Sequence, residues 1–357
     1  MERVLSLLQE VSEGKARLDL ENTLLAFNEL PLPQLFKFAD RVRERINGNT
    51  CTFIIDRNIN YTNVCEVRCS FCAFSRDEND KDAYTLSLEE ILSKVSEAKE
   101  FGATQVMIQG GLNRKTGLSY ITKVFESIKK NFPKITIHSL SAPEIEFLSR
   151  LEGLSFRETL KILKEAGLSS LPGGGAEILV DDVRQVVSPK KTRTDVWLKI
   201  HEEAHKLGLP STATMVIGHK ENIKDRITHL LKIRDLQDKT GGFMSFIPWV
   251  YYPGKTKLGG RKTTAADYLK TLSLARLFLD NIKHIQASWL TVGKAVGQIA
   301  LQAGADDLGS LMLEENVVRS TGHQVVSMKI EEMVHLIKSA GRKPAQRSTD
   351  FSIIRVF

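Results

Sequence analysis

The chain has 357 residues and 42% of them are hydrophobic, so it can bury a large core. Its 50 basic and 43 acidic residues give a net charge of +7, but the two signs are interleaved along the sequence. This pattern favours a solvated basic surface over a nucleic-acid-binding one. We find no run of 18 apolar residues and no basic-then-apolar leader, and we therefore expect a cytoplasmic protein without a membrane span.

Residues 1–50 carry apolar positions at helical spacing, and Pro31 and Pro33 interrupt them, which predicts a helical cap. An alternation of apolar strands and amphipathic helices follows. The expected strands are 52–57, 105–109, 134–140, 168–172, 211–217, 242–248, 284–290 and 306–311. Eight strands alternating with helices predict an α/β fold, a (βα)8 barrel of the TIM type. A partial six-strand barrel is the alternative, because the last two strands have the weakest patterns.

Helix and strand signals continue to the end of the chain. Ser87 and Glu90 form an expected capping box at the start of the first crossover helix. A helix is expected over 329–340 and a strand over 351–357. The predicted organisation is a helical segment (1–50), a barrel (51–320) and a C-terminal helix and strand packed on the barrel (321–357).

Three of the four cysteines lie within eight residues, at Cys65, Cys69 and Cys72, with the spacing C-x3-C-x2-C. Three thiolates on one loop can bind three irons of a [4Fe–4S] cluster and leave the fourth iron open to a small molecule. Structural zinc prefers four ligands, and no second C-x2-C pair exists. Disulfides would require an oxidising compartment. Cys51 lies near the start of the first strand, at an expected core position.

This spacing, with an aromatic residue before the third cysteine, resembles the radical S-adenosylmethionine (SAM) superfamily. Residues 55–65, IDRNINYTNVC, further resemble the dehypoxanthine futalosine cyclase family of the futalosine route to menaquinone. Aminofutalosine synthase and the deazaflavin (FO) synthase subunits are close cousins. The resemblance runs in patches over about 52–320, and it implies a [4Fe–4S] cluster on the three cysteines, with SAM as the second cofactor.

The resemblance also implies an activity, namely a radical SAM oxidoreductase that acts as a cyclase. A 5′-deoxyadenosyl radical would take the sugar C4′ hydrogen of dehypoxanthine futalosine, and the carbon radical would close a C–C bond onto the benzoate ring. Such an enzyme needs a one-electron donor such as flavodoxin or ferredoxin. The basic balance of the chain would suit an acidic donor that docks near the cluster.

Residues at the strand ends complete the expected site. Taken alone, Gln109-Gly110-Gly111 predicts a tight turn, and Glu177 after the run Gly173–Gly175 predicts a helix N-terminus. By resemblance, backbone carbonyls of the glycine pair hold the methionine amino group of SAM, although Leu112 stands where a glutamate is usual, and Glu177 binds the SAM ribose. The resemblance implies a cofactor set of Phe71, Gln109, Gly110, Gly111, Ser139, Glu177 and Ile247, and a proton acceptor among His138, His219 and Tyr61.

Other motifs leave alternatives open. The motif H-E-x-x-H at 201–205 can bind zinc, but it lies on a crossover helix outside the expected barrel, so we expect no zinc there. Gly254-Lys255-Thr256 lacks the first glycine of a phosphate-binding loop. The aromatic run at 246–253 fits either a core or a surface that stacks on an aromatic substrate. An iron–sulfur electron carrier or RNA-binding protein is the alternative from another class, and the barrel-length alternation opposes it.

Overall fold

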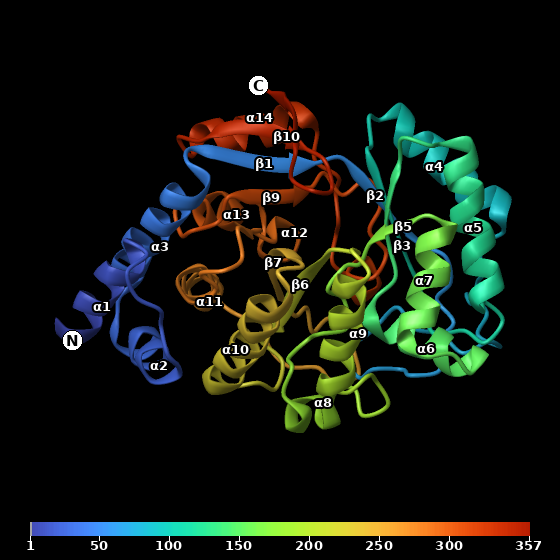
Figure 1. Ribbon diagram of the computed structural model, residues 1–357, viewed down its shortest axis with the longest axis horizontal. Helices are drawn as coiled ribbons and strands as arrows, with labels where there is room; N and C mark the ends of the chain where they lie inside the picture. Colours follow the sequence, from blue (N-terminus) through green and yellow to red (C-terminus); the bar gives the residue numbers. More distant parts are fainter. Residues whose placement is uncertain (1) are drawn as a thin grey trace.

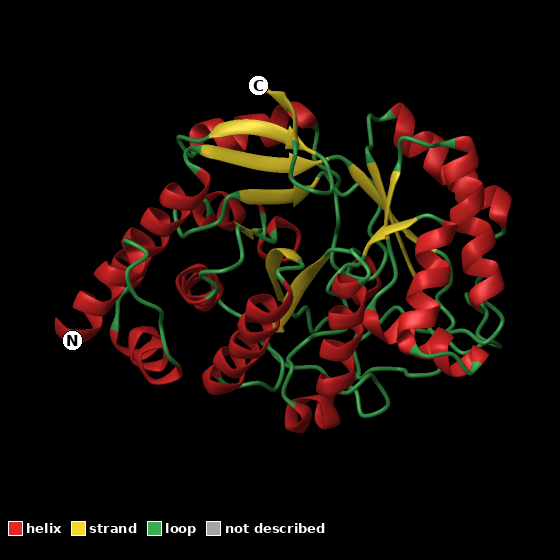
Figure 2. Ribbon diagram, in the orientation of Figure 1, coloured by secondary structure: helices red, strands yellow, loops and turns green. Residues whose placement is uncertain are grey.

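The computed structural model describes residues 2–357, and its strands lie inside a wall of helices (Figures 1 and 2). The helices are α1 (Glu2–Ser12), α2 (Leu20–Glu29), α3 (Leu32–Asn47), α4 (Leu88–Glu100), α5 (Leu118–Asn131), α6 (Ala142–Glu152), α7 (Phe156–Ala166), α8 (Asp181–Val187), α9 (Thr194–Lys206), α10 (Ile223–Thr240), α11 (Ala265–Phe278), α12 (Trp289–Val292), α13 (Lys294–Ala300) and α14 (Ile330–Ser339). The strands are β1 (Thr50–Ile54), β2 (Asp56–Asn60), β3 (Gln105–Gln109), β4 (Thr136–His138), β5 (Leu168–Ser170), β6 (Ser211–Ile217), β7 (Phe243–Val250), β8 (His284–Ile285), β9 (Asp307–Ser310), β10 (Lys343–Arg347) and β11 (Ile353–Val356).

The strands follow one another around a barrel. They form sheets ordered β11-β10-β1-β9, β2-β3-β4-β5 and β6-β7-β8, in which the β10–β11 pair is antiparallel and the other pairs are parallel. Single bridges join the sheets, from Leu171 to Ser211 after β5 and from Gln286 to Asp307 after β8. Since β1 runs into β2 through Ile55, the order returns to its start. The predicted TIM-type α/β fold is confirmed.

Three local expectations differ from the structure. The single strand expected at 52–57 is two strands, because the chain leaves the pairing with β9 and turns to pair with β3. Within 284–290 only β8 is extended, and the helix α12 begins at Trp289. β10 was not expected as a strand, and it pairs in parallel with β1, almost three hundred residues earlier. Pairing over such a separation leaves no periodic signal in the local sequence.

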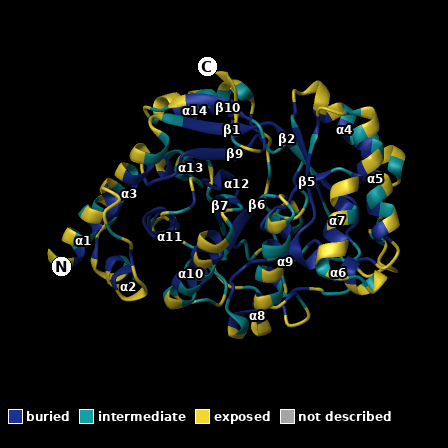
Figure 3. Cartoon of the chain, in the orientation of Figure 1, coloured by how far each residue is buried: buried dark blue, intermediate teal, exposed yellow. Residues whose placement is uncertain are grey.

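The helices cover the barrel because each presents one apolar stripe to it. α4 begins with the expected capping box, in which Ser87 Oγ accepts from Glu90 N–H at 3.2 Å and Glu90 Oε2 accepts from Ser87 N–H at 2.7 Å. Its residues Ile91, Val95 and Ala98 are fully buried against the sheet. Figure 3 shows the same division, with buried strands and exposed outer helix faces. No described helix is both long and apolar enough to cross a bilayer.

A buried ion pair fixes β10 to the barrel wall. Arg347 Nε donates to Asp307 Oδ2 at 2.6 Å and Arg347 Nη2 donates to Asp307 Oδ1 at 3.1 Å. Thr52 on β1 donates its hydroxyl to the same carboxylate at 2.5 Å. Three strands, β1, β9 and β10, therefore meet at one carboxylate, and loss of Arg347 would leave an uncompensated buried charge.

Several buried histidines are held neutral by the fold. Burial lowers the pKa of His229 to about 3, and Arg184 and Lys232 lower it further. Its Nδ1 accepts the backbone N–H of Leu179 at 3.0 Å. Burial similarly lowers the pKa of His205 to about 4. In the unfolded chain these imidazoles have a pKa of about 6.5. The unfolded state therefore binds protons at pH values where the folded state does not.

We expect acid to destabilise the protein below pH 6.5, with His229 as one source. Between pH 7 and pH 5.5 each such histidine should remove about 1 kcal/mol of unfolding free energy. His229→Asn keeps an acceptor for Leu179 N–H but has no titrating ring. Urea unfolding at both pH values should therefore give a smaller acid loss in this variant. Equal losses in variant and wild type would place the acid sensitivity elsewhere.

Candidate functional site

The cysteine loop lies between β2 and α4, at the carboxyl end of the barrel strands. Cys65, Cys69 and Cys72 line one cavity of about 250 Å³, and all three are free thiols. Ser70 anchors this loop from two sides: its N–H and Oγ–H donate to Val187 O at 3.0 and 2.8 Å, and its carbonyl accepts from Leu258 N–H at 2.8 Å. Two neighbouring segments thus hold the loop, and its three thiols line the cavity.

These thiols suit a multi-iron cluster better than a single ion. Among residues 2–357 no three His, Cys, Asp or Glu side chains converge on one point as a mononuclear site requires. The irons of a [4Fe–4S] cluster are separate atoms, so each thiolate needs to reach a different one. Three thiols around a shared cavity therefore fit that cluster and leave its fourth iron without a cysteine. Cys51 is buried within the barrel wall, away from this cavity.

The glycine pair after β3 lies directly beneath the cysteine loop. A Cβ on Gly111 would stand 2.1 Å from Val64 O and 2.9 Å from Cys65 Cβ, which no side chain permits. A Cβ on Gly110 would stand 2.8 Å from the ring of Tyr61. Gly111 N–H also donates to the carbonyl of Thr62 at 2.9 Å. Close backbone approach is therefore the reason for glycine at both positions.

A buried carboxylate, Glu144 of α6, holds the glycine pair from the other side. Its Oε1 accepts from Gly110 N–H at 3.0 Å and from Tyr61 Oη–H at 3.1 Å. Its Oε2 accepts from both N–H and Oγ–H of Ser141 at 2.7 Å. Burial raises the pKa of Glu144, and these hydrogen bonds oppose the rise. The sequence analysis missed Glu144, whose only signal was a capping-box spacing from Ser141.

Glu177 lies in the loop before α8 and at the junction of two cavities. The helix begins four residues later, at Asp181, so the helix N-terminus predicted from the residues alone is wrong. Glu177 Oε1 accepts from Lys191 Nζ at 2.8 Å, while its buried Oε2 has no hydrogen-bond partner and lies 3.7 Å from Arg184 Nη1. Burial opposes its charge, but Lys191 and Arg184 outweigh burial and lower its pKa. It is therefore an anionic acceptor with one oxygen free.

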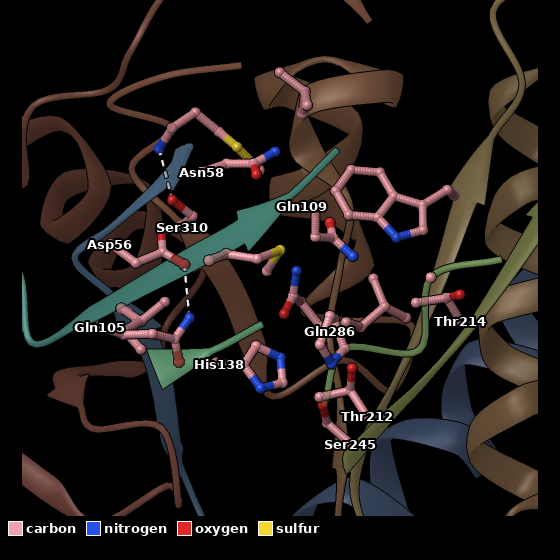
Figure 4. Close-up of a pocket in the computed structure, with 18 of the residues that line it drawn as sticks. Asp56, Asn58, Gln105, Gln109, His138, Thr212, Thr214, Ser245, Gln286 and Ser310 are labelled. Carbon is pink, nitrogen blue, oxygen red and sulfur yellow. Dashed lines mark hydrogen bonds between the residues drawn. The ribbon is translucent and has the colours of Figure 1, made fainter. Parts of the chain in front are cut away.

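The second cavity, of about 310 Å³, occupies the barrel interior (Figure 4). It adjoins the cysteine cavity, because several residues line both. The shared residues are Gln109, Gly174, Gly175, Glu177 and Val317. A molecule bound at the cysteines can thus extend past Glu177 into the barrel. The free acceptor oxygen at this junction and the three thiols beyond it fit SAM and an iron–sulfur cluster together.

The wall of the barrel cavity is mostly apolar, and amides, hydroxyls and a few ionisable groups are set into it. Asp56 Oδ2 accepts from Gln105 Nε2 at 2.9 Å, and burial raises the pKa of this carboxyl. His138 Nδ1 lies 2.7 Å from Ser170 Oγ, and burial, followed by Arg347, lowers its pKa to about 3. Figure 4 shows these side chains turned toward one another across the cavity.

Most of these polar residues were missed by the sequence analysis. They lie at alternate positions, Asp56 and Asn58 on β2 and Gln105 and Gln109 on β3, with the apolar Met107 between the last two. Side chains two residues apart on a strand share a face. The two glutamines at the ends of the otherwise apolar β3 were therefore a signal for the cavity wall.

The structure separates the remaining expected site residues into three groups. Phe71 lines the cysteine cavity, with Lys191 Nζ 5.4 Å from its ring centre, and Ile247 lines the barrel cavity. Ser139 lines neither cavity, since its buried Oγ accepts from Ile108 N–H. His219 also lines neither cavity, and its Nδ1 lies 3.1 Å from Glu221 Oε2.

Among the three candidate proton acceptors, only His138 lines the barrel cavity. Tyr61 is buried beneath the glycine pair, and burial raises its pKa well above the usual value. The aromatic run divides in the same way: Trp249 lines the barrel cavity, whereas Phe246 is fully buried in the core. Core and ligand-facing aromatics alternate along β7 as strand geometry requires.

The H-E-x-x-H motif on α9 uses its histidines for packing. His201 Nδ1 and His205 Nε2 both lie within hydrogen-bond distance of Ser211 Oγ, at 2.9 and 2.8 Å. The His201 ring centre lies 3.9 Å from that of Trp197, and His201 is fully buried between helix and sheet. Both imidazoles therefore bind the first residue of β6.

Comparison with known proteins places these features in context. The model of the radical SAM superfamily matches residues 59–233, and that of the CofH/MqnC C-terminal region matches 240–356. The chain is 46% identical to a cyclic dehypoxanthine futalosine synthase of Streptomyces coelicolor, over 94% of this chain and 85% of that protein.

Two further relatives have other names. A 5-amino-6-(D-ribitylamino)uracil–L-tyrosine 4-hydroxyphenyl transferase of Methanocaldococcus jannaschii is 41% identical over 97% of this chain and 98% of its own. An aminodeoxyfutalosine synthase of Thermus thermophilus is 37% identical over 99% and 97%. Among solved structures, methylornithine synthase (PylB) matches with a TM-score of 0.76 at 19% identity, over 95% of this chain and 97% of that one, which is a likeness of fold.

We expect Gly111→Ala to empty the cysteine site. The added methyl group would collide with the Val64 carbonyl and displace the loop that carries Cys65. After anaerobic reconstitution, bound iron and brown absorbance should fall severalfold. Gly117→Ala is the control, because a Cβ there meets only the Glu152 carboxylate tip at 3.3 Å. Full iron loading in Gly111→Ala would show that the close approach is dispensable.

We expect Glu177→Gln to weaken SAM binding without loss of the cluster. The neutral amide gives up about one charge-assisted hydrogen bond, on the order of 1–3 kcal/mol, or a tenfold to hundredfold loss of affinity. The substitution also leaves Lys191 without its counter-charge, so thermal stability is measured alongside. Titration of SAM into the reconstituted variant gives the affinity. Unchanged affinity in a less stable protein would assign Glu177 to the fold alone.

Proposed function

This chain belongs to the radical SAM superfamily, and we propose that it is a cyclase that converts dehypoxanthine futalosine to cyclic dehypoxanthine futalosine in menaquinone biosynthesis. The junction of the thiol-lined cavity with the barrel cavity at Glu177 is the observation that carries this proposal. It provides one enclosed path from a cluster to a substrate. The 46% identity with a synthase of this name supports the choice of substrate.

A [4Fe–4S] cluster with bound SAM supplies, when present, the 5′-deoxyadenosyl radical that takes the sugar C4′ hydrogen. In the proposal Cys65, Cys69 and Cys72 hold the cluster. Backbone groups of the Gly110–Gly111 pair and the free Oε2 of Glu177 orient SAM, so that its adenosyl group points into the barrel. The barrel wall holds the substrate sugar and excludes water, which would compete for hydrogen bonds in the cavity.

The barrel cavity has a mostly apolar wall with a few polar groups, which suits a sugar joined to an aromatic acid. The amides of Gln105 and Gln286 and the carboxyl of Asp56 can bind ribose hydroxyls. In the proposal the Nδ1–H of the neutral His138 ring donates to Ser170 Oγ, which leaves Nε2 as an acceptor for the substrate. Nε2 takes the proton that the benzoate ring loses after the bond closes, and the electron lost with it would return to the cluster held by Cys65, Cys69 and Cys72.

Product analysis tests the proposal against its relatives' reactions. The reconstituted protein is given SAM, dithionite and one of three substrates under anaerobic conditions: dehypoxanthine futalosine, an enolpyruvyl benzoate, or L-tyrosine with 5-amino-6-(D-ribitylamino)uracil. Cyclisation should release free 5′-deoxyadenosine, one per product, and the product should carry two hydrogen atoms fewer than its substrate. A synthase that adds the adenosyl radical to enolpyruvyl benzoate would instead retain the adenosyl group in its product. Turnover of enolpyruvyl benzoate, or of L-tyrosine with 5-amino-6-(D-ribitylamino)uracil, in place of dehypoxanthine futalosine would overturn the cyclase proposal.

We expect His138→Asn to uncouple radical formation from cyclisation. The amide can still bind Ser170 but has no group at the position of Nε2. General acid–base groups contribute about a hundredfold or more, so cyclic product should fall by that factor while free 5′-deoxyadenosine still forms. Ser170→Ala is the control, because it removes this hydrogen bond and keeps the imidazole. Unchanged product formation in His138→Asn would remove His138 from the reaction.

A further inference from the structure

One side of the cysteine loop carries a surface of unpaired positive charge. Residues 241–266 and 316–330 contain no Asp or Glu. Their exposed cations, together with an exposed lysine near α8, are here called the basic face. Its members are Lys190, Lys255, Lys257, Arg261, Lys262, Arg319 and Lys329. None of them takes part in an ion pair with another described residue, in contrast to their neighbours Lys191 and Arg193.

The basic face borders the cluster site directly. Leu258 N–H donates to the carbonyl of Ser70, between the second and third cysteines. Lys255 N–H donates to Thr321 O at 3.0 Å, which joins the two acid-free segments. Val187, which accepts both hydrogen bonds from Ser70, lies three residues before Lys190. All three segments of the basic face are therefore tied to the cysteine loop or to each other.

The charged residues of the cysteine loop itself are neutralised. Glu66 pairs with both Arg114 and Arg150. Arg68 pairs with Asp77. The cations of the basic face are not matched in this way, so they contribute a net positive field near the cluster site.

Exposed aliphatic residues lie within the same surface. Val186 is 57% exposed beside the Val187 anchor, and Val317 is 37% exposed where it lines the cysteine cavity. Protein interfaces combine an apolar centre with a charged rim, whereas single-stranded nucleic acid is bound by aromatic stacking and phosphate contacts. This mixture of valines and cations favours a protein partner.

We propose that the basic face is the docking surface for an acidic one-electron donor protein that reduces the cluster. The inference rests on the proposed function, since it needs a cluster at Cys65, Cys69 and Cys72. A flavin hydroquinone anion on the donor gives one electron to the oxidised [4Fe–4S]²⁺ cluster. The flavin becomes a neutral semiquinone and the cluster becomes [4Fe–4S]⁺, so charge balances without any other reactant.

The test compares two double variants with the same change in charge. K255E/K257E reverses two cations of the basic face. K130E/K134E, the control, reverses two exposed lysines before β4, at the amino end of the barrel and away from the cysteine loop. Each reconstituted protein is mixed anaerobically with a purified acidic flavodoxin in its hydroquinone state. The loss of cluster absorbance is followed by stopped flow at several salt concentrations, and reduction by dithionite is followed in parallel.

In wild type and control, the second-order rate with flavodoxin should be equal within twofold and should fall steeply with salt. In K255E/K257E it should be at least tenfold lower at low salt and nearly independent of salt, while iron content and dithionite reduction stay normal. Equal flavodoxin rates in both variants would overturn the proposal, as would wild-type reduction by dithionite but not by flavodoxin. Salt-sensitive binding of duplex DNA that only K255E/K257E loses, with flavodoxin reduction intact, would assign the surface to nucleic acid. A protein that binds no cluster would instead refute the proposed function.

Discussion

The site depends on one contact between two stretches of backbone. Gly111 approaches the carbonyl of Val64 so closely that even a methyl group has no room. That distance sets the height of the cysteine loop above the barrel strands, and hence the path from the thiols to the barrel interior. Glu144 fixes the other face of the glycine pair, and its hydrogen bond to Tyr61 ties β2 to α6. A buried carboxylate with every oxygen occupied makes this arrangement rigid.

The two cavities differ in charge, and Glu177 divides them. Toward the cysteines, its Oε1 is matched by Lys191, and the lysine also lies over the ring of Phe71. Toward the barrel, burial raises the pKa of Asp56 and lowers that of His138, so the charged forms of both groups are disfavoured. The ion pair of Glu177 and Lys191 therefore lies where a cationic, carboxylate-bearing cofactor would bind. The mostly apolar barrel interior suits a carbon radical, which needs orientation rather than a counter-charge.

The sequence predicted the fold well because its strands repeat one local pattern. All eight expected strand positions contain extended chain, and the cysteines were expected on a loop after the first strand, which the structure divides into β1 and β2. Prediction failed where structure depends on distant partners. The break at Ile55 exists because β1 and β2 pair with different neighbours. β10 is a strand because it pairs with the edge of β1.

The site was predicted only in part, because some of its residues belong to local motifs and others depend on distant contacts. Residues inside motifs, such as the glycine pair and Glu177, could be named, and the cavities were then found to contain them. Residues that matter through three-dimensional contacts, such as Glu144 and Arg347, carry no motif. Ser139 and His219 follow strands as expected, yet their side chains turn into the protein. Strand-end position alone does not decide which way a side chain faces.

The pairing of β10 with β1 also sets the order in which the molecule can be assembled. β1 is among the first segments to leave the ribosome, and β10 is among the last. Arg347 of β10 lines the barrel cavity and neutralises Asp307 on β9, so the cavity wall and its charge balance are incomplete until the final residues emerge. A nascent chain therefore lacks a finished barrel cavity until β10 has emerged, whereas every residue that lines the cysteine cavity precedes β10.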